Sequence, residues 1–224
     1  MPKLLDIFLQ PSSVFTAERE RPTFLVPIAL LALLTLVATL AYFMRVDPGW
    51  YADHMIDAMG RELSATEEAQ MRSAMPEART MGVIGAVTGV IGVAVMMALT
   101  ALYVWIAAKV TGRVLTFKHG LSLSSWSSMP LLLGLLVAIV GALTMSPQTS
   151  FESLMLTNVD PLLVDLPNDH RWNRVAQSFN LLSFWSLFLF ALGWKLWTRS
   201  SWLQAAVVAL IPTVVVFGIM AAVA

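Results

Sequence analysis

Residues 80–108 read TMGVIGAVTGVIGVAVMMALTALYVWIAA and contain no Asp, Glu, Lys, Arg or His. Arg79 and Lys109 bound this stretch. An α-helix rises about 1.5 Å per residue, and the hydrocarbon core of a bilayer is about 30 Å thick. The stretch therefore predicts a transmembrane helix that is longer than the core and must tilt or protrude from it.

The composition of the whole chain is that of a membrane protein. The 224 residues are 58% hydrophobic and 12% charged, and the formal net charge is zero. Soluble domains carry about 25% charged residues, so an ordinary soluble domain and a disordered chain are both excluded. A zero net charge argues against a nucleic-acid partner, which needs a basic face. The sequence has no cysteine, which excludes disulfides and thiolate metal sites.

Five apolar stretches predict an all-α polytopic membrane protein, because the runs lack the alternation of β-barrel strands. In lipid, each backbone polar group must be paired within its own helix. The predicted transmembrane domain covers 23–224, with spans at about 23–45, 80–108, 124–146, 176–197 and 201–223.

The lead-in at 1–22 is predicted to lie on the cytoplasmic side. Its apolar residues fall at helical spacings, and Pro11 can open a new turn. We expect an amphipathic helix at the membrane interface. The alternative is a short cytosolic segment that only leads into the first span.

Charge predicts the orientation. The loops on the N-terminal side of five spans carry eight basic and three acidic residues, and those on the other side carry six basic and eleven acidic residues. The two short loops on the N-terminal side have no acidic residue, and short loops weigh most in the positive-inside rule. We predict a multi-pass protein of the cell inner membrane with its N-terminus in the cytoplasm and its C-terminus outside.

Aromatic and basic side chains near the predicted span ends are expected to anchor the helices at the headgroup level. Tryptophan prefers that level, and a long basic side chain can reach it from within the apolar region. The predicted interface anchors are Trp50, Trp126, Trp172, Lys195, Trp197 and Trp202.

Four glycines in the second span, Gly82, Gly85, Gly89 and Gly92, are spaced three, four and three residues apart. This spacing places them on one helix face, where small residues let a neighbouring helix approach closely. We predict a helix-packing seam, more often with a helix of the same chain than with a second protein. Chance enrichment of glycine is the remaining alternative.

Local signals predict several helix boundaries. Ser64-Ala-Thr-Glu67 has the pattern of a capping box at a helix start. The serines within 122–128 are expected to return hydrogen bonds to their own helix rather than line a polar lumen. Pro130 is expected in a first helical turn or at a kink, and Pro212 at a kink.

The sequence carries no recognisable catalytic pattern. No ionisable residue lies deep within a predicted span, which argues against a proton-driven pump or a charge-selective channel. H-E-x-x-H, Walker A and G-x-S-x-G are absent. Asp160, Asp165, Asp169 and His170 lack any known metal-ligand spacing. We predict no enzyme activity, catalytic residue, metal or cofactor.

Three short stretches carry a family resemblance: Gln10–Phe15, Leu115–Pro130 and Phe179–Trp185, the last followed by Leu189, Gly193 and Ser200–Ala205. With these motifs the chain resembles the bacterial branch of the Yip (Ypt-interacting protein) domain family. Trp126 stands where the family often has Tyr, and Asn180 where Asp is common. The Asp-Leu-Tyr-Gly-Pro motif of the eukaryotic members, which are associated with Rab-type GTPases, is absent, so that role is not transferred.

The resemblance implies a five-span membrane protein that is not an enzyme and works with partners. The leading hypothesis is an accessory or scaffold subunit of a larger inner-membrane assembly, such as an envelope export or transport complex. Expected partners are membrane lipids and other membrane proteins, in a homo- or hetero-oligomer. The alternative is a transporter or channel for a lipid or a small hydrophobic molecule.

Overall fold

A computed structural model describes residues 3–58, 63–164, 166–167 and 170–223. The elements in this part of the chain are helices, and the one β-type pairing within it is an isolated bridge between Asn158 and Asn180. The described residues divide into two compact units, each built from separate segments of the chain. Unit 1 comprises the described residues of 3–33, 91–133 and 181–223, and unit 2 those of 34–90 and 134–180.

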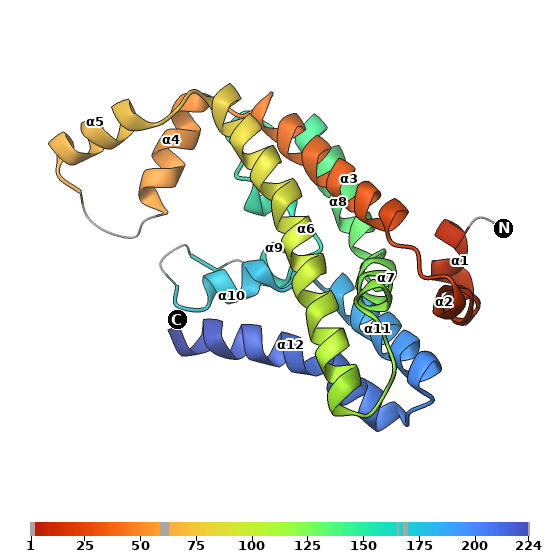
Figure 1. The fold of residues 1–224 in the computed structure, drawn as a ribbon. Coiled ribbons are helices and arrows are strands. Elements are labelled where there is room, and N and C mark those ends of the chain that lie inside the picture. The colour runs from red at the N-terminus through yellow and green to blue at the C-terminus, as the bar shows by residue number, and fades with distance from the viewer. Residues whose placement is uncertain (1–2, 59–62, 165, 168–169, 224) are drawn as a thin grey trace. The chain divides into compact units, whose positions relative to one another are not determined.

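The helices are distributed between the two units (Figure 1). Unit 1 holds α1 (Lys3–Leu9), α2 (Pro11–Glu20), α7 (Phe117–Ser127), α11 (Leu182–Thr198), α12 (Trp202–Val223), the start of α3 (Leu25–Phe43) and the second part of α6 (Ala78–Val110). Unit 2 holds the remainder of α3 and α6, most of α8 (Leu131–Thr144), and α4 (Pro48–Asp57), α5 (Ala65–Ala74), the 3-10 turn η1 (Glu152–Leu154), α9 (Val159–Leu162) and α10 (Asn173–Ser178).

Three described helices, α3, α6 and α12, are long and apolar enough to cross a membrane. The pair α7 and α8 is bent by 48° and would be a fourth span if it crosses as one element. Helix α11 has 17 residues and a length of about 26 Å, which is less than the thickness of the core. Between three and four spans therefore follow from the helices, while a fifth span and the orientation of the termini stay predictions.

The predicted fourth span at 176–197 differs from the structure, because α10 ends at Ser178 and α11 begins at Leu182. The backbone between them pairs elsewhere: the N–H of Val159 donates to the carbonyl of Phe179 over 2.8 Å. The side-chain amide of Asn180 also donates to Thr157 Oγ1. These hydrogen bonds join segments about 20 residues apart in the sequence, so the helix is interrupted there.

The predicted third span at 124–146 is also interrupted. Residues 128–130 form a turn, and Pro130 directly precedes α8. Proline has no N–H to donate to the preceding turn and clashes with it, so α7 cannot continue straight into α8. The kink expected at Pro130 is confirmed by the 48° bend between the two helices.

The lead-in forms two short helices, α1 and α2, and its place at the membrane interface stays a prediction. Pro11 occupies the first turn of α2, as its position in the sequence predicted. Ile7, Val14 and Phe15 are buried, and α2 packs against α7 and α11 within unit 1. The lead-in is therefore part of the core of unit 1.

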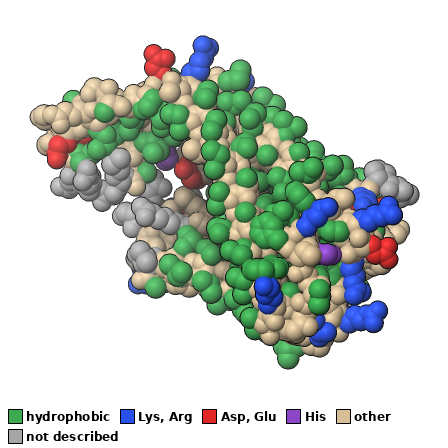
Figure 2. Space-filling model, in the orientation of Figure 1, with side chains coloured by type: hydrophobic (Ala, Val, Ile, Leu, Met, Phe, Trp, Pro, Cys, Tyr) green, Lys and Arg blue, Asp and Glu red, His purple; other side chains and the backbone are tan. Residues whose placement is uncertain are grey.

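Large apolar side chains are exposed along α6 (Figure 2), including Val83, Val87, Ile91, Val95 and Leu99. Neighbours four residues apart are adjacent on a helix, so these side chains form a continuous exposed face that winds slowly around α6. Such a face would be costly in water but is stable against lipid tails. The exposure of this face is what a membrane-spanning helix requires.

The charge asymmetry predicted from the loops coincides with the two units. By sequence, unit 1 holds eight basic and three acidic residues, a net charge of +5. Unit 2 holds six basic and eleven acidic residues, a net charge of −5. The predominantly basic loops thus belong to one unit and the predominantly acidic loops to the other.

Candidate functional site

The first two seam glycines, Gly82 and Gly85, face α3 within unit 2. A Cβ atom on Gly82 would lie 2.7 Å from the Cβ of Phe43. One on Gly85 would lie 3.2 Å from Cγ2 of Thr39. Both distances are shorter than ordinary carbon–carbon contacts, so α3 and α6 approach each other because these positions have no side chain.

The other two seam glycines differ from each other. A Cβ atom on Gly89 would lie 3.0 Å from Cγ2 of Thr35, whereas one on Gly92 would meet nothing within 4 Å. The structure therefore brings Gly89 to α3 together with the first two glycines and leaves Gly92 open. A seam that includes all four positions stays a prediction.

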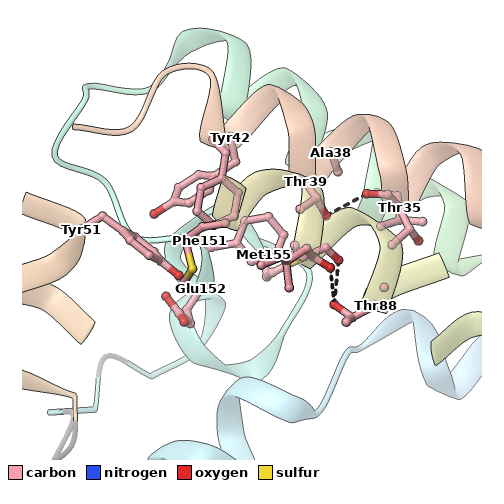
Figure 3. A pocket seen from close by; sticks show the side chains of 15 residues that line it. Thr35, Ala38, Thr39, Tyr42, Tyr51, Thr88, Phe151, Glu152 and Met155 are labelled. Carbon is pink, nitrogen blue, oxygen red and sulfur yellow. Dashed lines mark hydrogen bonds between the residues drawn. The ribbon is translucent and has the colours of Figure 1, made fainter. Parts of the chain in front are cut away.

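A cavity of about 590 Å³ lies beside these glycines, within unit 2 (Figure 3). Small and apolar residues of α3 and α6 form most of its wall, among them Ala38, Ile84 and Gly89. Phe151 and Met155, which follow α8, line it as well. The cavity is of the size that small-molecule sites in proteins have.

The threonines in this wall direct their hydroxyl protons to their own helices. Thr39 donates to the carbonyl of Thr35 over 2.9 Å, and Thr88 donates to the carbonyl of Ile84 over 2.8 Å. Such bonds within a helix leave the oxygen of each threonine only as an acceptor. The wall therefore offers methyl groups and weak acceptors to a molecule in the cavity.

One carboxylate, Glu152, lines the cavity, together with the phenols of Tyr42 and Tyr51. Glu152 Oε2 lies 3.7 Å from His54 Nε2, and the Tyr42 hydroxyl donates to the carbonyl of Thr149 over 3.1 Å. Burial and the negative charge of Glu152 raise the pKa of Tyr51 above its ordinary value. This end of the cavity is polar and carries a negative charge.

Two tryptophans predicted as interface anchors have packing roles in unit 1. The indole N–H of Trp126 donates to the carbonyl of Thr23 over 2.9 Å, and that of Trp197 donates to the carbonyl of Phe15 over 2.6 Å. Both side chains are 3% exposed. Buried indole N–H groups usually find such a partner, and here the partners belong to α2 and the segment that follows it.

The other predicted anchors are more accessible. Trp172 is 39% exposed beneath the guanidinium of Arg171, and Trp202 is 49% exposed beneath the ammonium of Lys195. Trp50 lies at the start of α4 and is partly buried. Their placement at the headgroup level stays a prediction.

Glu18 on α2 is fully buried, which the sequence did not indicate. Its carboxylate accepts hydrogen bonds from Lys3 Nζ and Ser122 Oγ, each over 2.8 Å, and from the backbone and side chain of Thr23. A buried carboxylate is tolerated when it is paired and hydrogen-bonded in this way. Glu18 therefore joins α1, α2, α7 and the segment before α3.

The serines of α7 mostly behave as predicted. The hydroxyls of Ser124, Ser125, Ser127 and Ser128 donate to backbone carbonyls of the same helix. Ser122 is the exception, because it donates to the buried carboxylate of α2. These bonds satisfy the hydroxyls within their own helix. Ser124, Ser127 and Ser128 also line a cavity of about 270 Å³ together with Ser183 and Ser186 of α11.

Pro212 lies inside α12 and cannot donate a hydrogen bond to the carbonyl of Val208, four residues before it. The hydroxyl of Tyr103 on α6 donates to that carbonyl over 2.6 Å. This side chain replaces the missing helix hydrogen bond, a role that no local sequence signal indicates.

The acidic loop after α8 shows no metal-ligand arrangement among its described residues. Asp160 is 5% exposed, and its carboxylate accepts a hydrogen bond from the side-chain amide of Asn173. Asp165 and Asp169, considered with it as ligands, lie outside the described residues. Ser64 and Glu67 do form the predicted capping box at the start of α5.

These features define an α-helical membrane protein with apolar lipid-facing helices and a cavity beside a close helix contact. The chain belongs to the Yip1 domain family, whose model matches residues 5–224. It is 29% identical over 192 residues to the membrane protein YknW of Bacillus subtilis. The aligned region covers 86% of this chain and 77% of YknW. No solved structure matches the chain. The family is not a known family of enzymes.

Proposed function

We propose that this Yip-family chain is a non-catalytic protein of the cell inner membrane that acts as an accessory or scaffold subunit of a larger membrane assembly. It would cross the membrane five times, with its N-terminus in the cytoplasm, and would contact other membrane proteins in a homo- or hetero-oligomer. An envelope export or transport complex is the kind of assembly that fits a chain without intramembrane ionisable groups.

The observation that carries this proposal is the exposure of α5, none of whose ten residues is buried. A helix of this length is marginal in water unless it packs against something. Its capping box supports the helix start, and an ion pair between Arg72 and Asp53 links it to α4. Neither contact covers the exposed positions Ala65, Glu68 and Ala69 of α5, so we infer that a partner subunit binds there.

The other surfaces proposed for partners have contacts within the chain. The lead-in packs in the core of unit 1, and the glycines of α6 that approach α3 do so within unit 2. The outer helix α5 is thus the surface that best supports the accessory role among the described residues.

Site-specific crosslinking would test the accessory role, since the chain has no native cysteine. Ala69→Cys places a thiol on exposed α5, and Val95→Cys places one on the lipid-facing surface of α6 as a matched control. We expect stable co-purification of other subunits and adducts from position 69 only. A protein that purifies alone and gives no adduct from position 69 would contradict the proposal.

The cavity beside the seam favours a second candidate, a transporter or channel for a lipid or small hydrophobic molecule. An isolated chain that moves lipid or solute across liposomes would support this candidate over the accessory role. If lipid or solute moved only when the co-purifying subunits were present, the result would support the accessory role.

A further inference from the structure

The cavity of unit 2 has two chemically different parts (Figure 3). Glu152 and Tyr51 lie together at one end, while Thr35 and Thr88 lie further along the hollow between α3 and α6. The hollow lies beside the close contact between α3 and α6, and Leu135 and Met155 complete its wall. The cavity therefore offers an apolar channel that leads to a carboxylate.

The charge at the polar end selects the chemistry of an occupant. Among the described residues, Glu152 is the one charged side chain that lines the cavity, and none of these lining residues is Lys or Arg. A carboxylate only accepts hydrogen bonds when it is ionised, and it attracts positive charge. Tyr51 beside it can add a hydroxyl donor or acceptor. An ammonium group would find two suitable contacts here, whereas a phosphate or carboxylate alone would be repelled.

In the part of the chain that the structure describes, the ionic neighbour of Glu152 is His54, whose Nε2 lies 3.7 Å from Glu152 Oε2. The side chain of Glu152 is about half exposed, at 48%. Because the distance to His54 exceeds that of a hydrogen bond and the carboxylate is half exposed, Glu152 can accept a shorter hydrogen bond from another donor.

We propose that this cavity binds a bilayer lipid, with an alkyl chain between α3 and α6 and a primary ammonium head group paired with Glu152. A lipid fits because lipids surround membrane-spanning helices, and because one molecule carries both an alkyl chain and an ammonium head group. The proposal deepens the second candidate function, but binding itself requires neither transport nor a partner subunit.

Native mass spectrometry of the purified full chain, with added lipid, tests the site directly. The probes are phosphatidylethanolamine, which has the primary ammonium group, and phosphatidylglycerol, which has none. We expect Glu152→Gln to reduce phosphatidylethanolamine retention about tenfold, which corresponds to about 1.4 kcal/mol. Retention of phosphatidylglycerol should not fall, because the variant removes a repelling charge. Glu68→Gln, which removes an exposed carboxylate from α5, is the matched control and should change neither lipid.

A second pair of variants tests the apolar part. Thr88→Phe fills the hollow from an exposed position and should reduce retention of phosphatidylethanolamine, while Val95→Phe on the same helix should not. The proposal is overturned if Glu152→Gln retains phosphatidylethanolamine like the wild type, if it weakens both lipids equally, or if Thr88→Phe has no effect. These outcomes do not depend on co-purified subunits or on lipid movement, so they are separate from the tests of function.

Discussion

Gly120 on α7 is the position where a single added methyl group should cost most. A Cβ atom there would lie 2.5 Å from the carbonyl oxygen of Ala101 on α6, and 2.8 Å from its Cα. Carbon–oxygen contacts normally lie at about 3.3–3.6 Å. The two helix backbones would therefore have to separate by most of an ångström, and no flexible side chain can absorb the change.

Overpacking of this kind costs about 1–3 kcal/mol. For a protein of this length, that predicts a fall in the unfolding temperature of roughly 2–12 °C for Gly120→Ala. Gly92→Ala is the matched control, because a Cβ atom there meets nothing within 4 Å. Alanine also has the higher helix propensity, so the control should be neutral or slightly more stable.

Thermal unfolding of the detergent-solubilised variants, followed by near-ultraviolet circular dichroism, measures this difference. Equal unfolding temperatures for Gly120→Ala and Gly92→Ala would refute the close contact between α6 and α7. A loss confined to Gly92→Ala would refute the assignment of an open surface to that glycine.

Three further changes test separate contacts. Tyr103→Phe should lower the free energy of unfolding by about 1–3 kcal/mol. The loss should be smaller in a Pro212→Ala background, where residue 212 can again donate to the carbonyl of Val208. Equal losses in both backgrounds would refute the claim that the Tyr103 hydroxyl replaces the missing helix hydrogen bond. Trp197→Phe removes the donor to the carbonyl of Phe15 and should make the N-terminal helices more sensitive to limited proteolysis; unchanged cleavage would show that this hydrogen bond does not hold them. Ser64→Ala should weaken the start of α5 by about 1 kcal/mol, measurable as faster local hydrogen exchange, and unchanged exchange there would contradict the cap.

Local sequence signals predicted local structure well. The capping box at Ser64 and Glu67 and the new turn at Pro11 depend on neighbouring residues alone, and both are present. The glycine spacing on α6 predicts a face where a helix can approach closely, but it could not identify α3 as the neighbour of three of the four glycines. That choice depends on contacts with residues far along the chain.

The features that the sequence missed depend on distant partners. Asn180 is followed by apolar residues in the sequence, so the pattern predicts that it is part of a span. In the structure its side-chain amide donates to Thr157, and Asn180 lies between α10 and α11. Trp126 was assigned to the membrane interface because an indole suits that position, but it equally suits a buried site with a carbonyl nearby. Glu18 has no local sequence signal for burial, because two of the groups that bind its carboxylate, Lys3 and Ser122, are distant in the sequence. The fold brings four hydrogen-bond donors to this carboxylate.

The orientation of the basic and acidic loops is the central claim, and cysteine labelling tests it most directly. Lys118→Cys lies at the start of α7, on the predicted cytoplasmic side. Gln148→Cys lies in the predicted outer loop after α8, and both side chains are exposed. A membrane-impermeant maleimide applied to intact cells should label position 148, and should label position 118 only after permeabilisation. Labelling of both positions in intact cells, or of position 118 alone, would contradict the predicted topology.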